Sequence, residues 1–273
     1  MENNILRPTF TNYILKKLIN GESINVYGTV DFDEYSCKGI GIGKSRLVED
    51  LVLLAPTNII SISLDMNNYR FGKSFDKFLD DISKPLGNEV FKSFGAFIEG
   101  VKEKKVMLLI DNFHYFFDND KKDTRFDAHF IDNLNSAHNK VNISILVMTN
   151  KPHTNYNLCV GNGDECRASW LVFEDIEVSE LTHGELSTEV NKVFPTLTNN
   201  ERVTIVGYLN GALSIAIIDK LKQLLDSGQS IDNLEILVKV VQKSCKKRYT
   251  KGGNIWLERL SEFKTWIPFL KGD

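Results

Sequence analysis

The 273-residue chain lacks several features that would assign it to a particular class of protein. No stretch approaches the ~20 apolar residues that a membrane span needs. The N-terminus has neither a basic region nor a long apolar segment, so we expect no signal peptide. The net charge is only −3, so the molecule as a whole does not attract nucleic acid. With no repeats or low-complexity tracts, the sequence indicates a cytoplasmic globular protein that does not contact membranes.

Cysteine is also scarce. The four cysteines are Cys37, Cys159, Cys166 and Cys245. Cys159 and Cys166 are too far apart for a zinc knuckle, and a chain of this size needs no disulfides to fold. Free thiols in a reducing compartment are the simplest interpretation.

What the chain does contain is an alternation of strand-like and helix-like segments. The predicted strands are Ile24–Tyr27, Asn58–Met66, Val106–Asp111, Val141–Met148 and Trp170–Val178. The predicted helices between them are Thr9–Ile19, Ser45–Leu54, Phe75–Ile82, Val90–Val101 and Asp127–His138. The unbroken apolar run at Val106–Ile110 is typical of a parallel strand buried on both faces. The pattern predicts an α/β fold with a mostly parallel sheet and ligands at the carboxyl ends of its strands.

After Val178 the pattern becomes purely helical. Thr182 and Glu185, like Thr198 and Glu201, have the spacing of a capping box. Further helical patterns follow at Ala212–Leu225, Ile231–Lys247 and Ile255–Leu270. We therefore predict an α/β core over residues 1–178 and a helical domain over residues 179–273.

The most specific motif is the glycine-rich stretch between the first strand and the second helix. Strand, glycine-rich loop and helix is the order found in a phosphate-binding P-loop, whose amides and helix dipole face one anion. Lys44 would reach the β- and γ-phosphates of ATP, and the Ser45 hydroxyl would bind Mg²⁺. The predicted nucleotide-binding residues are Gly39, Gly41, Ile42, Gly43, Lys44, Ser45 and Arg46.

The loop departs from the usual G-x-x-x-x-G-K-[ST] pattern, because Lys38 stands where the first glycine is expected. Gly28 can take that role if the loop is about ten residues longer than usual. The additional residues can be placed at Thr29–Lys38, which is rich in acids. This excursion is either a lid or partner contact beside the phosphate site, or a solvated loop without a role.

Asp111 ends an apolar strand and is the natural partner of the P-loop, with a carboxylate that would hold Mg²⁺ opposite Ser45. Many P-loop ATPases place a water-activating glutamate next, but here Asn112 follows. An amide cannot accept a proton, and general-base help is typically worth about 10²–10⁴-fold in rate. Hydrolysis is therefore expected to be slow, or to use another group such as His114. The competing interpretation of His114 is packing among the neighbouring aromatic residues.

Thr149 and Asn150 end the next strand, where a polar side chain either faces the γ-phosphate or simply makes a turn. Asn150-Lys151-Pro152-His153 resembles the guanine-reading N-K-x-D motif of GTPases. His153 replaces the required aspartate, so specificity for GTP is excluded.

These motifs resemble those of the AAA+/STAND class of P-loop ATPases. Leu108–Asp111 resembles a Walker B strand, Val147–Asn150 a sensor-1 strand, and Asn210–Ser214 the start of a lid helix. The resemblance implies a five-stranded parallel sheet, a helical lid over ATP and ATP-dependent oligomerisation. It also implies catalytic roles for Lys44, Asp111, Asn150 and Arg167. Arg167 lies where such rings place an arginine that reaches the neighbouring subunit, although a plain surface arginine is the alternative. Ser214 lies near the position of a sensor-2 arginine.

A basic run near the C-terminus is the other candidate site. It comprises Lys243, Lys246, Lys247, Arg248 and Lys251. Such a patch can bind the phosphates of DNA in a salt-sensitive way, and it can equally be a solvated helix end.

Two functional hypotheses follow. The first is a Mg-ATP-binding ATPase that acts as an oligomerisation switch, with slow hydrolysis and a partner that reads the bound state. The second is a DNA-binding adaptor whose nucleotide site only stabilises its fold.

Overall fold

The computed structural model describes residues 5–28, 31–33, 36–38, 42–69, 74–87, 90–117, 123–140, 142–160, 165–209, 213–228 and 234–250. The side chains of residues 31–33, 36–38, 159–160, 165–168 and 246–250 lie outside this description. No helix among the described residues is long and apolar enough to cross a membrane.

A five-stranded parallel sheet forms the centre of the molecule, as the sequence predicted. Its order is β4 (Ile60–Asp65), β5 (Val106–Asp111), β6 (Ile143–Thr149), β1 (Ile24–Tyr27) and β9 (Glu174–Glu177). β5 and β6 are buried along their whole length, which explains their unbroken apolar sequences. β1 therefore lies between β6 and β9, and the segment after it leaves the sheet beside the end of β6.

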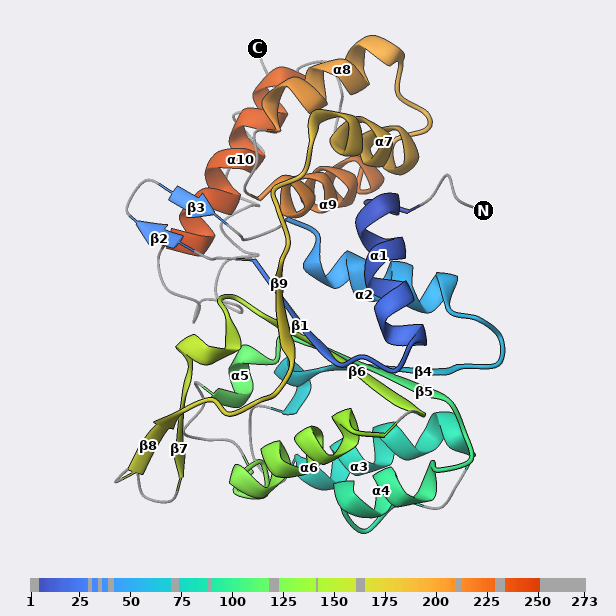
Figure 1. Cartoon of the computed structure of the whole chain (residues 1–273). Helices are drawn as coiled ribbons and strands as arrows, with labels where there is room; N and C mark the ends of the chain where they lie inside the picture. Colours follow the sequence, from blue (N-terminus) through green and yellow to red (C-terminus); the bar gives the residue numbers. More distant parts are fainter. Residues whose placement is uncertain are drawn as a thin grey trace.

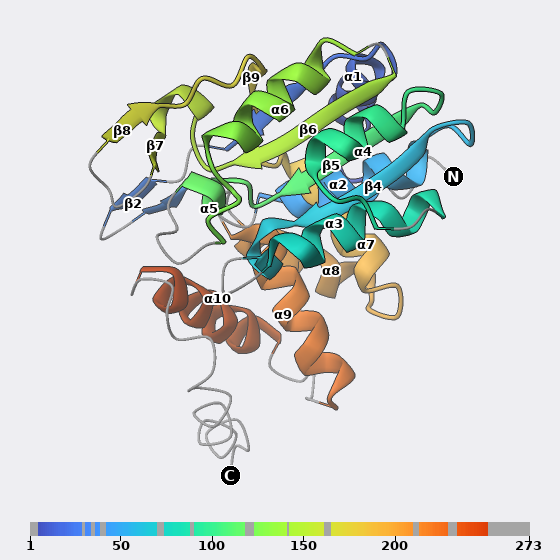
Figure 2. The same cartoon turned by 90° about the horizontal axis from the view of Figure 1, so that it is seen from below.

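Helices cover both faces of the sheet. α1 (Pro8–Ile19) and α2 (Lys44–Leu54) lie on one face, and α3 (Phe75–Ser83), α4 (Phe94–Gly100) and α6 (Ala128–His138) lie on the other (Figure 1; Figure 2 shows the sheet from below). The short helix α5 (His114–Phe117) follows β5, where an aromatic loop was expected. Phenylalanines on α3, α4, α5 and α6 pack together under the sheet as one aromatic core.

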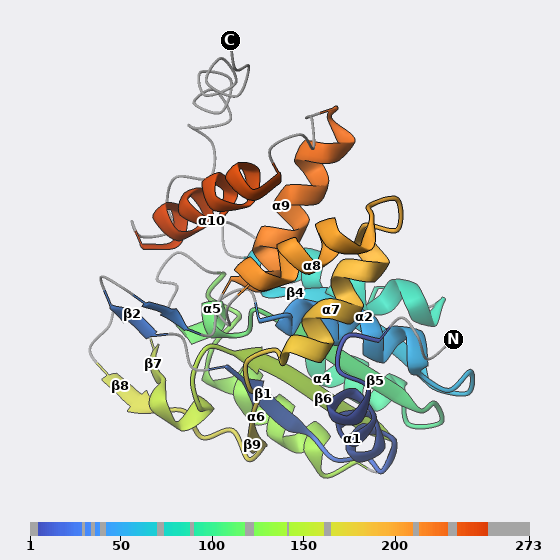
Figure 3. The same ribbon diagram turned by 90° about the horizontal axis from the view of Figure 1, so that it is seen from above.

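The described C-terminal part is helical, as predicted, and has its own apolar core; the helix predicted at Ile255–Leu270 lies outside the described residues. α7 (His183–Val193), α8 (Asn199–Tyr208), α9 (Ser214–Asp226) and α10 (Leu234–Thr250) form a cluster that also buries Leu6 (Figure 3). The capping boxes at Thr182 and Thr198 are both formed, so these helices begin where the sequence indicated. Because Leu6 belongs to this cluster, the N-terminal segment joins the helical part to the sheet.

Three further predicted segments differ from the structure. The helix expected at Val90–Val101 begins only at Phe94, because Ser93 caps it by accepting a hydrogen bond from the amide of Ala96. The strand expected at Trp170–Val178 is limited to Glu174–Glu177. Asn135 of α6 donates to the carbonyl of Trp170 and accepts from the amide of Val172, so the first residues are held against a helix. The segment Thr29–Lys38 contains a β-hairpin of β2 (Asp31–Asp33) and β3 (Ser36–Lys38).

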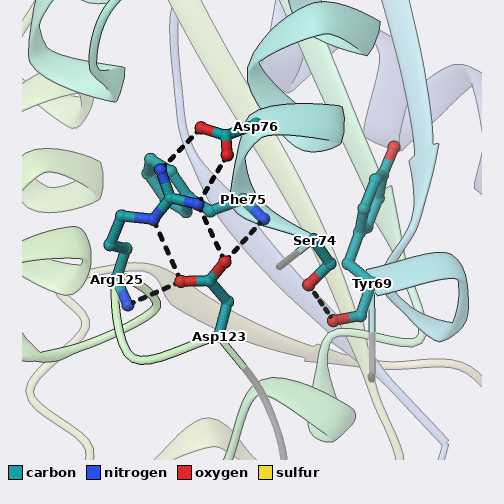
Figure 4. Close-up of polar contacts among 6 residues, drawn as sticks. All are labelled: Tyr69, Ser74, Phe75, Asp76, Asp123 and Arg125. Carbon is teal, nitrogen blue, oxygen red and sulfur yellow. Dashed lines mark hydrogen bonds and ion pairs between the residues drawn. The ribbon is translucent and has the colours of Figure 1, made fainter. Parts of the chain in front are cut away.

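Polar contacts at the start of α3 connect this helix to the segment that contains Asp123 and Arg125 (Figure 4). Asp123 accepts a hydrogen bond from the amide of Phe75 at 3.2 Å, and the Arg125 guanidinium bonds to both Asp123 and Asp76. Arg125 also lies over the Phe75 ring, 5.1 Å from its centre. Hydrogen bonds from Arg125 lower the pKa of the Asp123 carboxyl to about 2.

Replacing Asp123 by asparagine is expected to lower the free energy of unfolding by about 1–2 kcal/mol at pH 7, because a charge-assisted bond in a nearly buried position is lost. The carboxyl pKa is lower in the folded state, so its contribution is present above about pH 4 and is lost as the pH falls towards 2. Urea unfolding at pH 7 and pH 3 checks this: the variant should differ from the parent at pH 7 more than at pH 3. Asp226→Asn, at an exposed helix pair, is the control and should change little.

Candidate nucleotide-binding site

The P-loop begins where β1 ends and finishes where α2 begins. Gly43 caps α2 with a left-handed backbone, φ = 86°, which glycine adopts without strain. A Cβ atom on Gly43 would lie 2.6 Å from Leu6 and 3.5 Å from Ile215 of α9. A Cβ on Gly28 would lie 2.6 Å from Ile42. Both positions therefore lack room for a side chain, and Ile215 of the helical part lies close to the end of the loop.

Of the predicted loop residues, Gly39 and Gly41 lie outside the described part. Ile42 is buried and packs in the core between the sheet and α1 and α2. The Arg46 side chain bonds to Asp50 and Glu49 along α2, both at 3.1 Å. Arg46 therefore forms ion pairs with two acids of its own helix.

Lys44 points to the carboxyl ends of β1 and β6. Its Nζ donates to the carbonyl oxygen of Thr149 at 3.0 Å and to the side-chain oxygen of Asn150 at 2.7 Å, with the carbonyl of Gly28 at 3.4 Å. Burial lowers its pKa to about 8, and the charge of Asp111 opposes that shift. Among the described residues, this half-buried cation has carbonyl and amide oxygens and one carboxylate near it, which suits a second, anionic partner.

Asp111 is buried beside Ser45. Burial raises the pKa of this carboxyl, while a hydrogen bond from the Ser45 side chain and another from the Asn112 amide, at 2.7 Å, lower it. The charge of Asp65 raises it further. A hydroxyl and a carboxylate are oxygen ligands of the kind Mg²⁺ prefers, so Ser45 and Asp111 fit the proposed metal. Among the described residues, no group of three or more His, Cys, Asp or Glu side chains is placed to hold a metal ion. Mg²⁺ at Ser45 and Asp111 would therefore need further ligands, such as phosphate oxygens.

The end of β6 gives its two polar residues different surroundings. Thr149 is fully buried, and its hydroxyl lies 3.0 Å from the side-chain oxygen of Asn25, which in turn donates through its amide to Asp175 of β9. Asn150 instead bonds to Lys44, and its backbone amide donates to the Tyr156 hydroxyl. Asn150 thus lies beside the Lys44 ammonium, and Thr149 belongs to the sheet.

Asp65 is a site residue that the sequence did not single out. It ends β4, directly beside Asp111 in the register of the sheet, and accepts a hydrogen bond from the Asn112 side-chain amide at 2.9 Å. The predicted strand Asn58–Met66 contains Asp65, but the sequence does not show which strand lies beside it. The pairing of β4 with β5 places Asp65 next to Asp111. His114 is half-buried with its ring 4.2 Å from that of Tyr115, in keeping with the packing interpretation.

The remaining candidates lie in other parts of the fold. Arg167 is on β8 (Glu165–Ala168), which pairs with β7 (Asn157–Val160) in a hairpin beside α5 (Figure 1). Lys243 is exposed on α10, the helix that also carries Lys246, Lys247 and Arg248; Lys251 lies outside the described residues. Ser214 is buried at the start of α9. The side chains of Arg167 and of the three α10 cations after Lys243 are not described.

Comparisons with solved structures give the same architecture. Domain III of the replication initiation protein DnaA of Thermotoga maritima has 15% identity and a TM-score of 0.54, over 89% of this chain and 95% of that one. The ORC2 protein of Aeropyrum pernix, in its ADPNP-ADP complexes, has 13% identity and a TM-score of 0.55, over 86% of this chain and 66% of that one. The fold is that of the AAA+ P-loop ATPases. A Walker-type ATPase of Pyrococcus abyssi has 13% identity and a TM-score of 0.53, over 97% and 77% of the two chains.

In the strand order of this chain, β1, which precedes the P-loop, lies beside β6, which ends next to Asn150. Searches of protein-family models and of curated proteins found no match. At such low identity the likeness concerns the fold.

Proposed function

We propose that this chain binds Mg-ATP and hydrolyses it slowly, and that the bound nucleotide controls its assembly with further copies. The observation that carries this is the position of Lys44, a half-buried cation at the start of α2, facing Asp111 and Asn150. The chain that surrounds it has the AAA+ fold.

The residues around Lys44 supply the parts of a triphosphate site. Backbone amides at the start of α2 face the β-phosphate, and Lys44 gives up its contacts with Thr149 and Asn150 to reach the phosphates. Ser45 and Asp111 would hold Mg²⁺, which would neutralise phosphate charge. Asn150 would then donate its amide to the γ-phosphate.

Residues 179–273 form the lid in this proposal. Ile215 of α9 approaches Gly43, and Leu6 lies in the apolar core of α7–α10, so the loop touches the helical part directly. A nucleotide that orders the loop therefore acts on surfaces that a second subunit can read. Arg167 is proposed to complete the site of the neighbouring copy.

The proposal is tested by measuring Mg-ATP and Mg-ADP binding by calorimetry, and mass by light scattering with and without each nucleotide. We expect micromolar binding and a larger mass with ATP. Arg167→Ala should keep ATP binding but lose ATP-dependent assembly. A mass that is the same with ATP, ADP or no nucleotide would contradict the switch.

The DNA-binding alternative predicts a different result in the same samples. Reversing the charges of Lys246, Lys247 and Arg248 to glutamate should abolish DNA retention at low salt and leave ATP-dependent mass unchanged. If the parent protein retains DNA equally with and without nucleotide, the DNA-binding alternative is favoured.

A further inference from the structure

Two carboxylates end neighbouring strands at the nucleotide edge of the sheet. Asp65 of β4 and Asp111 of β5 are directly paired in the parallel register. Asp111 is buried and lies beside Ser45 and Lys44. Asp65 is only half-buried. The two acids therefore occupy different environments, which allows them different roles.

Asn112 connects the two carboxylates. Its backbone amide donates to Asp111 Oδ1 at 2.7 Å, and its side-chain amide donates to Asp65 Oδ1 at 2.9 Å. Its left-handed backbone, φ = 55°, directs the side chain across to β4. The following amide, of Phe113, donates to the carbonyl of Met148 at 2.8 Å. Asn112 is thus fixed from both sides.

The orientation of Asp65 is set by two donors. The amide of Asn67 and the side chain of Asn112 both bond to Oδ1, each at 2.9 Å. Both bonds use the same oxygen, so Oδ2 is the oxygen that can accept a proton. Asn112 itself cannot, because an amide side chain is not a base near neutral pH.

We infer that Asp65 is the general base of ATP hydrolysis in this chain, and that Asn112 is a positioning residue that holds it; this rests on the proposed function. A water oxygen forms a bond to the γ-phosphorus while the bond from that phosphorus to the β–γ bridging oxygen breaks. The proton of the water passes to Asp65, and ADP and inorganic phosphate leave. Asp65 then returns the proton to solvent.

The experiment compares Asp65→Asn with the parent protein in single-turnover hydrolysis, Mg-ATP calorimetry and urea unfolding. We expect the rate to fall about 10²-fold or more, with ATP affinity within threefold and unfolding little changed. Asp80→Asn, at a half-exposed position on α3 where the carboxylate pairs with Lys84, is the matched control and should keep the parent rate.

A double substitution that exchanges the two side chains is the decisive experiment. Asp65→Asn combined with Asn112→Asp keeps an amide–carboxylate pair with its polarity reversed, and should recover at least tenfold of the lost rate. A parent-like rate in Asp65→Asn overturns the inference, and so does a loss of ATP affinity equal to the loss of rate. If the parent binds ATP without turning it over, the inference fails while nucleotide binding stands; if it binds no ATP, both fail.

Discussion

Replacing Lys44 by methionine is expected to weaken Mg-ATP binding by about 10²-fold or more. Removing one partner of a buried, hydrogen-bonded charge pair typically costs about 2–5 kcal/mol, and each ~1.4 kcal/mol is tenfold in affinity. The same substitution should make the empty protein more stable. Desolvation lowers the pKa of Lys44 to about 8, below its ordinary value, so at neutral pH the partly desolvated ammonium destabilises the folded state.

Calorimetry and urea unfolding at pH 7 check both parts. Lys222→Met removes an exposed lysine of α9 and should change neither. Unchanged ATP affinity in Lys44→Met would contradict the whole site. The lowered pKa adds a result for the parent protein. Phosphate favours the charged lysine, so above about pH 8 binding must take up a proton and the affinity should fall as the pH rises.

Gly43→Ala is expected to have the second-largest effect. The left-handed backbone of this residue costs a residue with a Cβ roughly 1–2 kcal/mol. The new methyl group would also lie 2.6 Å from Leu6, so the loop or the N-terminal segment must move. We expect a loss of about 1–3 kcal/mol in unfolding free energy and at least a tenfold loss of ATP affinity, because the amides after Gly43 would be displaced.

A second glycine provides the comparison. Gly207 lies within α8, has no atom within 4 Å of the position its Cβ would take, and has no positive φ. Gly207→Ala should therefore be neutral or stabilise the protein by up to about 1 kcal/mol. If both glycine substitutions had the same small effect, the backbone of Gly43 would not be constrained as described.

Most of the fold could be predicted because the spacing of apolar residues in the sequence matches the burial of the strands and helices that they form. The apolar runs that became β5 and β6 have no exposed face to encode, so their sequences are unbroken. The capping boxes at Thr182 and Thr198 mark helix starts locally. The predicted strand beginning at Trp170 was too long, because Asn135, far away in sequence, takes the hydrogen-bonding groups that would have continued the sheet.

The site was predictable only as far as single motifs reach. Lys44, Ser45 and Asp111 follow from sequence patterns, and the structure brings them together. The partners of Asn112 and Asn150 depend on which strands are neighbours, which the sequence does not state. Asp65 became a candidate through its pairing with Asp111. The division of the chain at residue 178 and the roles of Arg167 and the basic run stay predictions.

The β2–β3 hairpin changes the entropy of the long phosphate loop. An open loop about three times the usual length would cost roughly 1 kcal/mol more to close. Pairing Asp31 with Lys38 brings those two positions to within about 5.5 Å, so the hairpin closes most of the insertion by itself. What remains between β1 and α2 is two short connections. Residues could therefore be gained or lost between β2 and β3 with almost no additional entropic cost of closing the connection from β1 to α2.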